Sequence, residues 1–326
     1  MISCTEYIPM YSEFFKYLEA KEGPDAVMEY WIYVSDNKIG DKTNPNSMAY
    51  KCDRLGGYAG AKAYWGHTIS EEACNTFSVR NTKVNCSYSH MRRCTSRAIL
   101  NSLTHVEPYH NYCEHCKVIY SRVLEKYGVV YDRDHSKVEN AECCSVLYEK
   151  DTPPDFDWRN ITDEELIEKF KDNPDYVISE NIREGKKYLH RDFHISKDLV
   201  YKYCGEKYGD DEVIDFIVNY TKAYYSPIIS QIKEKGISFL KEWIEKVYET
   251  EEASDVLHTE LKDNVLTVVI DKCPVIEYMR SLNQQPSKYH IENTRTYYDT
   301  IAKECGFNFN LEYYNDDGAA KFTFSL

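Results

Sequence analysis

FKYLEAKEGPDAV at residues 15–27 and YKYCGEKYGDDEV at residues 201–213 are two versions of one segment. They share aromatic, lysine, glycine and acidic residues at equivalent places, and the apolar positions keep a helical spacing. A long segment that returns in altered form within one chain indicates a repeated structural unit. This pair of segments therefore predicts that the chain consists of two related parts.

Two further matches follow in the same order along the chain. Asn85 and Cys94 correspond to Asn264 and Cys273, with the same spacing within each pair. YGVVY at residues 127–131 corresponds to CGFNF at residues 305–309. The sequence therefore predicts a tandem duplication, with a first repeat at 1–150, a connector at 151–194 and a second repeat at 195–326.

The predicted fold class is α+β, in which each copy has a helical lead followed by a small antiparallel sheet in the order β-α-α-β-β. Helical spacing covers 11–19 and 24–34, and strand alternation covers 84–92 and, more clearly, 265–270. SEEA at residues 70–73 resembles a helix start, with a short turn as the alternative, and the connector contains a capped helix that begins at Thr162. The remaining predicted elements are helices after Cys94 and over 112–127, and strands at 129–133, 143–149, 308–313 and 320–325.

Composition narrows the classes of function. The formal net charge of −14 argues against nucleic acid as a partner, because phosphate binding requires a concentrated basic surface. No apolar run reaches the roughly 18 residues that a membrane span needs, and the first twenty residues lack a signal-peptide pattern. The 12 cysteines are therefore expected to be thiols or metal ligands in a reducing cytoplasm, and the expected partner is a small molecule.

The densest reactive stretch is HNYCEHC at residues 110–116, and only the first copy carries it. Cys113 and Cys116 fall on one helix face, and an N-cap at Asn111 would place Cys113 in the first turn, where thiolate is favoured. Together with His115 and His110, these cysteines form a candidate site for a metal such as zinc. The alternative is structural, since Cys113 and Cys116 also begin an apolar stripe that a buried helix would need.

Three other residues are candidate catalytic groups. Cys94 lies where a strand runs into a helix, a common position for nucleophiles, although retention of Cys273 at the equivalent corner also suits a packing role. His67 and Glu71, four residues apart, would share one helix face as base and orienting group or as metal ligands. They follow a glycine-rich segment that a ligand could approach.

Other cysteines and histidines give weaker signals. Cys143 and Cys144 begin a strand, so their side chains point to opposite faces and at most one can join a site. His190 and His194 lie four residues apart in the connector and are expected to be solvated.

Part of the first copy, from Gly56 to Glu149, resembles the bacterial family known as L-2-amino-thiazoline-4-carboxylic acid hydrolase. The resemblance implies hydrolytic opening of a cyclic C–N or C=N bond in a sulfur-containing heterocycle, giving N-carbamoyl-cysteine. The chain departs from the family at Cys94-Thr95, where Cys-Pro is expected. The segments that carry the resemblance are YWGH (64–67), SEEA (70–73), MRRC (91–94), HVEPY (105–109) and YCEHC (112–116).

These observations lead to three hypotheses. The first is a hydrolase acting on a small cyclic amide or thiazoline, either metal-assisted with His67 or Glu71 as base, or metal-free with Cys94 as nucleophile. The second is a non-catalytic small-molecule-binding or sensor protein with a Cys/His metal or thiol site. The third, thiol redox at Cys113 and Cys116, lacks the preceding βαβ setting of thioredoxin-type sites.

Overall fold

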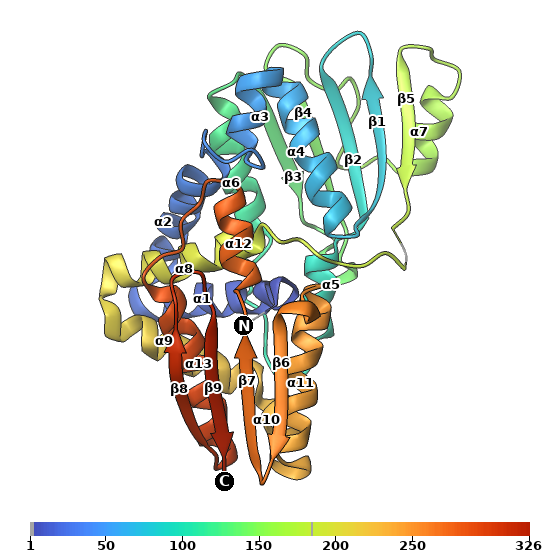
Figure 1. Ribbon diagram of the computed structural model, residues 1–326. Helices are drawn as coiled ribbons and strands as arrows, with labels where there is room; N and C mark the ends of the chain where they lie inside the picture. Colours follow the sequence, from blue (N-terminus) through green and yellow to red (C-terminus); the bar gives the residue numbers. More distant parts are fainter. Residues whose placement is uncertain (1–2, 184) are drawn as a thin grey trace. The chain divides into compact units, whose positions relative to one another are not determined.

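The computed structural model describes residues 3–183 and 185–326, which form thirteen α-helices and two antiparallel sheets (Figure 1). The mixed α+β class expected from the sequence is confirmed. Contacts group the chain into two units. Unit 1 contains the chain up to Tyr17, residues 104–107 and residues 191–326, and unit 2 contains residues 18–103 and 108–190.

Unit 2 is built around a five-stranded sheet with the order β3-β4-β2-β1-β5. Helix α4 packs against β4, α6 against β3 and α7 against β5. Its strands are β1 (Asn75–Asn81), β2 (Cys86–Arg93), β3 (Val129–Asp134), β4 (Cys143–Glu149) and β5 (Tyr176–Asn181). Its helices are α2 (Pro24–Val34), α3 (Met48–Leu55), α4 (Gly57–Glu71), α5 (Thr95–Ser102), α6 (Glu114–Glu125) and α7 (Asp163–Phe170), with a π-helical turn (Ser35–Ile39) and a 3-10 turn (Val138–Asn140).

Unit 1 is built around a four-stranded sheet with the order β6-β7-β9-β8, and α11 and α13 pack against its outer strands. Its strands are β6 (Leu257–Lys262), β7 (Val265–Ile270), β8 (Asn308–Tyr314) and β9 (Ala320–Ser325). Its helices are the first part of α1 (Tyr7–Glu22), α8 (Phe193–Tyr208), α9 (Asp210–Tyr224), α10 (Ser226–Lys235), α11 (Ile237–Thr250), α12 (Pro274–Ser281) and α13 (Tyr289–Cys305), with 3-10 turns at Cys4–Glu6 and Ser254–Val256.

The two sheets share one order of elements and one register. Unit 2 runs β1-β2-α5-α6-β3-β4, and unit 1 runs β6-β7-α12-α13-β8-β9. Residue pairs across the central strands also correspond: Met91 faces Cys143, and Ile270 faces Ala320. Unit 1 has one strand more than the expected β-α-α-β-β, because β6 precedes the predicted set, and unit 2 has two more, because β1 precedes the set and β5 follows it. β1 was missed because only Phe77 and Val79 are strongly apolar within its otherwise polar sequence.

Local helix signals were reliable where a cap or a proline defined them. α2 begins at Pro24, and α7 begins after Thr162, whose side chain forms a capping box with Glu165. Of the two alternatives for residues 70–73, the helix start is wrong and the short turn is confirmed, because α4 ends at Glu71 and a turn follows in which Ala73 has a left-handed backbone with φ of 50°. The polar run there marks the end of a helix.

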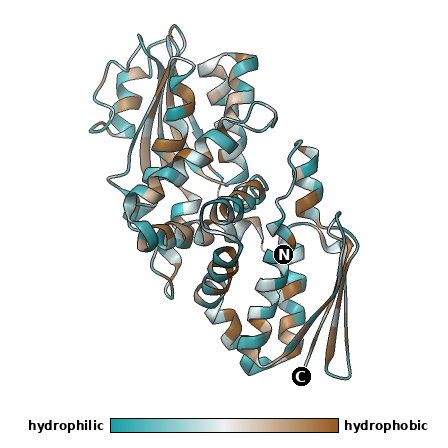
Figure 2. Ribbon diagram, turned by 90° about the vertical axis from the view of Figure 1, so that its left-hand side faces the viewer, coloured by the Kyte–Doolittle hydropathy of each residue, from teal (hydrophilic) through white to brown (hydrophobic). Residues whose placement is uncertain are grey.

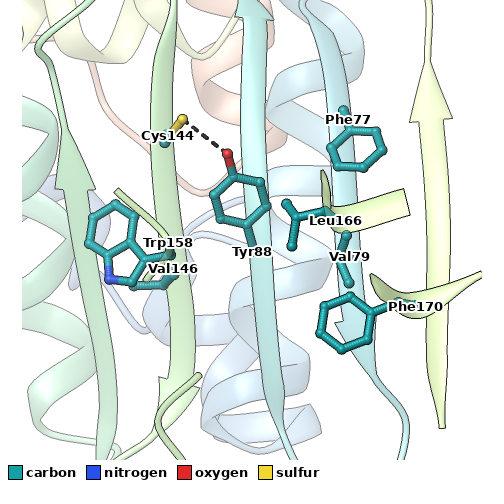
Figure 3. Packing of buried hydrophobic residues seen from close by; sticks show 8 residues of the cluster. All are labelled: Phe77, Val79, Tyr88, Cys144, Val146, Trp158, Leu166 and Phe170. Atoms are coloured by element: carbon teal, nitrogen blue, oxygen red, sulfur yellow. Dashed lines mark hydrogen bonds between the residues drawn. The ribbon is translucent and has the colours of Figure 1, made fainter. Parts of the chain in front are cut away.

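One face of the unit 2 sheet holds an apolar core (Figure 3). The hydroxyl group of Tyr88 lies 3.1 Å from the Cys144 sulfur within this core. Connector residues complete it, so residues 151–190 fold as part of unit 2. The core residues are Phe77, Val79, Tyr88, Cys144, Val146, Trp158, Leu166 and Phe170.

The helices of both units carry hydrophilic and hydrophobic residues in turn along their length (Figure 2). This alternation is typical of helices with one buried face. None of the helices in the described part of the chain combines the length and apolar character that crossing a membrane requires.

Candidate functional site

The second face of the unit 2 sheet lines a cavity of about 250 Å³, partly covered by α4. This volume is slightly below the usual range of roughly 300–1,000 Å³ for ligand pockets, so it suits a molecule of amino-acid size. The lining residues are Lys62, Trp65, Gly66 and Ile69 from α4, Thr76, Ser78, Ser87, Ser89, Met91, Tyr131, Arg133, Cys143, Ser145 and Leu147 from the strands, and Asn181 and Arg183.

Strand alternation explains how one sheet provides both a core and a cavity. Along β4, Cys144 and Val146 enter the apolar core, whereas Cys143 and Ser145 line the cavity. The prediction that adjacent Cys143 and Cys144 face opposite ways is confirmed. Ser89 on β2 pairs directly with Ser145, and neither hydroxyl has a hydrogen-bond partner among the described residues. Small polar side chains here leave space that apolar ones would fill.

Helix α4 supplies one wall of the cavity through the face that carries Trp65 and Gly66. The Trp65 ring packs against Tyr131 with centroids 4.7 Å apart and the two ring planes tilted by 33°. Gly60 has a different role, because a Cβ there would lie 2.4 Å from the Cys52 backbone of α3. The glycine-rich segment therefore mainly allows two helices to pack closely, and only Gly66 borders the cavity.

The charge of the cavity is opposite to that of the chain. Lys62, Arg133 and Arg183 line it, and no Asp or Glu is among its lining residues. In a protein of net charge −14, this concentration of cations favours an anionic ligand.

Arg133 on β3 forms its side-chain contacts with other residues that line the cavity. Its Nη2 lies 2.6 Å from the Cys143 sulfur, and its Nη1 lies 3.3 Å from the Tyr131 hydroxyl. Its buried Nε has no hydrogen-bond partner, and no carboxylate pairs with the guanidinium within the described residues. Carboxylates are the usual partners of a guanidinium that is partly removed from water, so the half-buried guanidinium of Arg133 is suited to bind an external anion.

Four thiols interact electrostatically with Arg133, and we call these four the thiol cluster. They come from the start of α5, the start of α6 and the start of β4, three segments that are far apart in sequence. The members are Cys94, Cys113, Cys116 and Cys143. The structure thus brings together three of the cysteines that the sequence analysis selected.

The thiols of this cluster are protonated at neutral pH. Burial raises the pKa of Cys113 to about 12, and burial raises the pKa values of Cys94, Cys116 and Cys143 although Arg133 opposes the effect. The expected thiolate at Cys113 is wrong for this state. Burial is the largest cause of the raised pKa of Cys113, and the neighbouring Cys116 adds to it. Cys113 occupies the N-cap position, one residue before the first turn of α6, which begins at Glu114.

The prediction of an N-cap at Asn111 is also wrong, because the N-cap of α6 is Cys113. The Asn111 backbone carbonyl accepts a hydrogen bond from the Glu114 amide at 3.1 Å, and the Glu114 carboxylate instead faces His135 at 3.0 Å. A turn of backbone hydrogen bonds over residues 109–116 replaces the expected side-chain cap.

His115 and His110, the two predicted histidine ligands, have different surroundings. His115 is buried, its Nδ1 contacts the Tyr112 carbonyl, and its Nε2 lies 3.4 Å from the Cys116 sulfur. Burial lowers the pKa of His115 to about 4, so its imidazole is neutral. His110 is exposed and lies 3.8 Å from Glu19.

The predicted ligand set Cys113, Cys116, His115 and His110 does not converge on a point. Within residues 3–183 and 185–326, His, Cys, Asp and Glu ligand atoms meet within 4.8 Å of one another in a single group of three, which lies in unit 1. A metal at the predicted set therefore stays a prediction.

His67 and Glu71 lie together near the end of α4, as their spacing indicated. His67 Nε2 is 3.5 Å from the Glu71 carboxylate, and His190 Nδ1 is 2.6 Å from the same oxygen. The expectation that His190 and His194 are solvated is wrong, because the two residues are 1% and 2% exposed. The carboxylate of Glu71 thus joins two imidazoles.

Cys94 caps the start of α5 without a side-chain hydrogen bond to the helix. Its amide donates to the Ala141 carbonyl at 2.7 Å, as the amide of Cys273 donates to Asp317 at 3.1 Å. Cys94 does not line the cavity, whereas Cys143 does.

Sequence reasoning missed Arg133, Ser89 and Ser145. Arg133 is the last residue of the strand predicted at 129–133, and strand alternation places it on the same face as Tyr131. A charged residue on the face that also carries Tyr131 was the signal that could have identified it. The serines carried no signal of their own, because their role depends on the opposite face of the sheet being apolar.

Comparison of the chain with protein-family models, with curated proteins and with solved structures gave no match. The case for function therefore depends on the geometry of the cavity.

Proposed function

We propose that unit 2 binds a small carboxylate-bearing molecule in the cavity and hydrolyses a cyclic amide or thiazoline-type bond in it. The observation that carries this proposal is the set of three cations without a lining carboxylate, in a chain of net charge −14. Arg133 would hold the carboxylate, because its guanidinium has no anionic partner of its own among the described residues.

The remaining wall groups suit a small polar ring. Trp65 and Tyr131 offer aromatic surface, and the unpartnered hydroxyls of Ser89 and Ser145 offer hydrogen bonds to ring heteroatoms. The volume of about 250 Å³ favours one small heterocycle.

Cys143 is the reactive thiol in this proposal, in place of Cys94. It lines the cavity and its sulfur lies 2.6 Å from Arg133, which favours the thiolate once the proton has left. For a 2-amino-thiazoline ring, the Cys143 sulfur bonds to the carbon between ring sulfur and ring nitrogen, the ring carbon–sulfur bond breaks, and the ring sulfur takes the proton that the Cys143 thiol gives up. Water then adds to the same carbon, the bond from that carbon to Cys143 breaks, and N-carbamoyl-cysteine and the Cys143 thiol are released. Zinc at Cys113, Cys116 and His115 would be a separate, metal-assisted form of the same proposal.

We further propose that the chain arose by tandem duplication and that the second copy lost the site. The shared register supports this, because cavity residues of unit 2 have apolar counterparts in unit 1. The paired counterparts are Ser89 and Ser145 with Val268 and Phe322, and Ser87 and Leu147 with Leu266 and Phe324.

Binding and turnover are tested separately with L-2-amino-thiazoline-4-carboxylate and its uncharged carboxamide. We expect the carboxylate to bind, and Arg133→Met to weaken it by about 10–100-fold, since a hydrogen bond to a charged group contributes roughly 1.5–3 kcal/mol. Arg93→Met, at an exposed arginine of the same unit, is the control. Equal affinity for carboxylate and carboxamide would contradict the proposed anchor.

Cys143→Ser should abolish formation of N-carbamoyl-cysteine while binding persists. Cys144→Ser, one residue away on the opposite sheet face, is the matched control and should keep turnover. Carboxylate binding without turnover in the wild type would favour the second candidate function, a non-catalytic binding or sensor protein, which the same cavity supports.

A further inference from the structure

Three buried ligand groups meet in unit 1, apart from the cavity of unit 2. Cys4 lies in the 3-10 turn at Cys4–Glu6, His194 in the first turn of α8, and Glu251 directly after α11. Their side-chain ligand atoms all lie within 4.8 Å of one another. The three residues are 1%, 2% and 3% exposed.

Hydrogen bonds fix the carboxylate at the centre of this group. Glu251 Oε1 accepts from the Ser3 hydroxyl at 2.7 Å and from the Cys4 amide at 2.5 Å. Glu251 Oε2 lies 3.0 Å from His194 Nε2. The group is therefore held by three separate elements, and its geometry does not depend on one flexible side chain.

Hydrogen bonds within the protein do not use every polar atom of this group. The buried Nδ1 of His194 has no hydrogen-bond partner among the described residues. Lys197, one turn further along α8, is also buried and interacts electrostatically with Cys4 and Glu251. A bound cation would be repelled by this ammonium group, so negatively charged ligands are needed to offset the repulsion.

We propose that Cys4, His194 and Glu251 form a binding site for a transition-metal ion of the zinc class. Thiolate, imidazole and carboxylate are ligands of Zn²⁺, and three protein ligands leave a fourth position for water or a small molecule. Binding forms a metal–sulfur bond and releases the Cys4 thiol proton to solvent. The thiolate and carboxylate together then balance the two positive charges of the ion.

Metal content and cobalt spectroscopy on the full chain test this site. Protein purified without chelator should contain about one equivalent of zinc-class metal, and metal-free protein titrated with Co²⁺ should develop a thiolate-to-cobalt charge-transfer band. Cys4→Ser should abolish the band, and His194→Gln should weaken metal binding at least tenfold. Glu251→Gln, which keeps the shape of the side chain, should do the same.

The control is the double variant Cys113→Ser/Cys116→Ser in unit 2, which should keep both the metal and the band. Circular dichroism of each variant separates loss of metal from loss of fold, and Glu251→Gln provides the reading if Cys4→Ser fails to fold. Absence of binding in the wild type, or binding lost only in the double variant, would overturn the proposal. If the wild type binds no metal, the role of the group is structural, because Glu251 holds the turn at Ser3 and Cys4 through hydrogen bonds.

Discussion

The inner faces of the two sheets have the same register but opposite contents. In unit 1, Val268 pairs with Phe322, and both are completely buried. In unit 2 the equivalent pair is Ser89 with Ser145, and a cavity of about 250 Å³ lies over them. The backbone arrangement therefore tolerates either a packed core or an open pocket, and the side chains alone decide between them.

The difference extends to the strand at the edge of this face. Tyr131 and Arg133 of β3 occupy the places that Phe309 and Leu311 hold on β8, as their pairing with Leu147, Ser145, Phe324 and Phe322 shows. Unit 1 gains stability from the aromatic contact of Phe322 with Tyr298, at 4.9 Å between centroids. Unit 2 keeps a guanidinium without a carboxylate partner among the described residues, which costs stability and is a feature that binding sites retain.

The largest predicted effect is the loss of packing on the apolar inner face of the unit 1 sheet. Phe322→Ala should lower the free energy of unfolding of unit 1 by about 3–5 kcal/mol, because it leaves a cavity in a filled core. Hydrogen exchange of peptides from β7 and β9 measures the loss. Phe239→Ala, at a partly exposed phenylalanine of the same unit, should cost less, and equal costs would contradict the assignment of Phe322 to the core.

The second prediction concerns the buried imidazole of His115. Its pKa falls from an ordinary 6.5 to about 4 on folding, so the unfolded chain binds the proton more readily. The stabilisation is present above pH 6.5 and is lost as the pH falls through about 4, and it amounts to about 3 kcal/mol. A His115→Asn variant should show a correspondingly shallower loss of stability between pH 7 and pH 4.

Denaturant unfolding in a Trp243→Phe background measures this effect, because the other three tryptophans belong to unit 2. His258→Asn, at an exposed histidine, should retain the wild-type slope. Parallel curves for wild type and His115→Asn would show that the imidazole does not titrate in the folded state as proposed.

The third prediction concerns a variant in which the cavity face of the unit 2 sheet receives the apolar side chains of unit 1. Ser89→Val with Ser145→Phe installs the pair found in unit 1, and the cavity should accept the added side chains without unfolding. Binding of L-2-amino-thiazoline-4-carboxylate should weaken at least about tenfold, which corresponds to roughly 1.4 kcal/mol. Calorimetric titration measures it, and unchanged affinity would place the ligand elsewhere.

The smallest predicted effect is at Ser145, which occupies in the unit 2 sheet the position that Phe322 occupies in the unit 1 sheet. Ser145→Ala should change the free energy of unfolding by less than about 0.5 kcal/mol, because the hydroxyl has no protein partner among the described residues. Hydrogen exchange of β2 and β4 peptides gives the value. A loss comparable to that of Phe322→Ala would mean that the face over Ser145 is packed.

Periodicity and caps determined much of the fold from the sequence alone. The helices at Pro24–Val34 and Asp163–Phe170 and the strands at Val129–Asp134 and Cys143–Glu149 follow from local signals. The start of α6 and the end of α4 were misjudged, because Asn111 and Ser70 are polar residues that fit a cap as well as a turn.

The sequence by itself also located the cysteine-rich segment and the opposite facing of Cys143 and Cys144. Only the tertiary structure gathered Cys94, Cys113, Cys116 and Cys143 around Arg133, and Cys4 with His194 and Glu251, since these groups come from segments far apart in the chain. It also decided that these thiols of unit 2 are protonated and that His115, His190 and His194 are buried. Local patterns fix backbone conformation, whereas burial and charge at a side chain depend on which distant segments surround it.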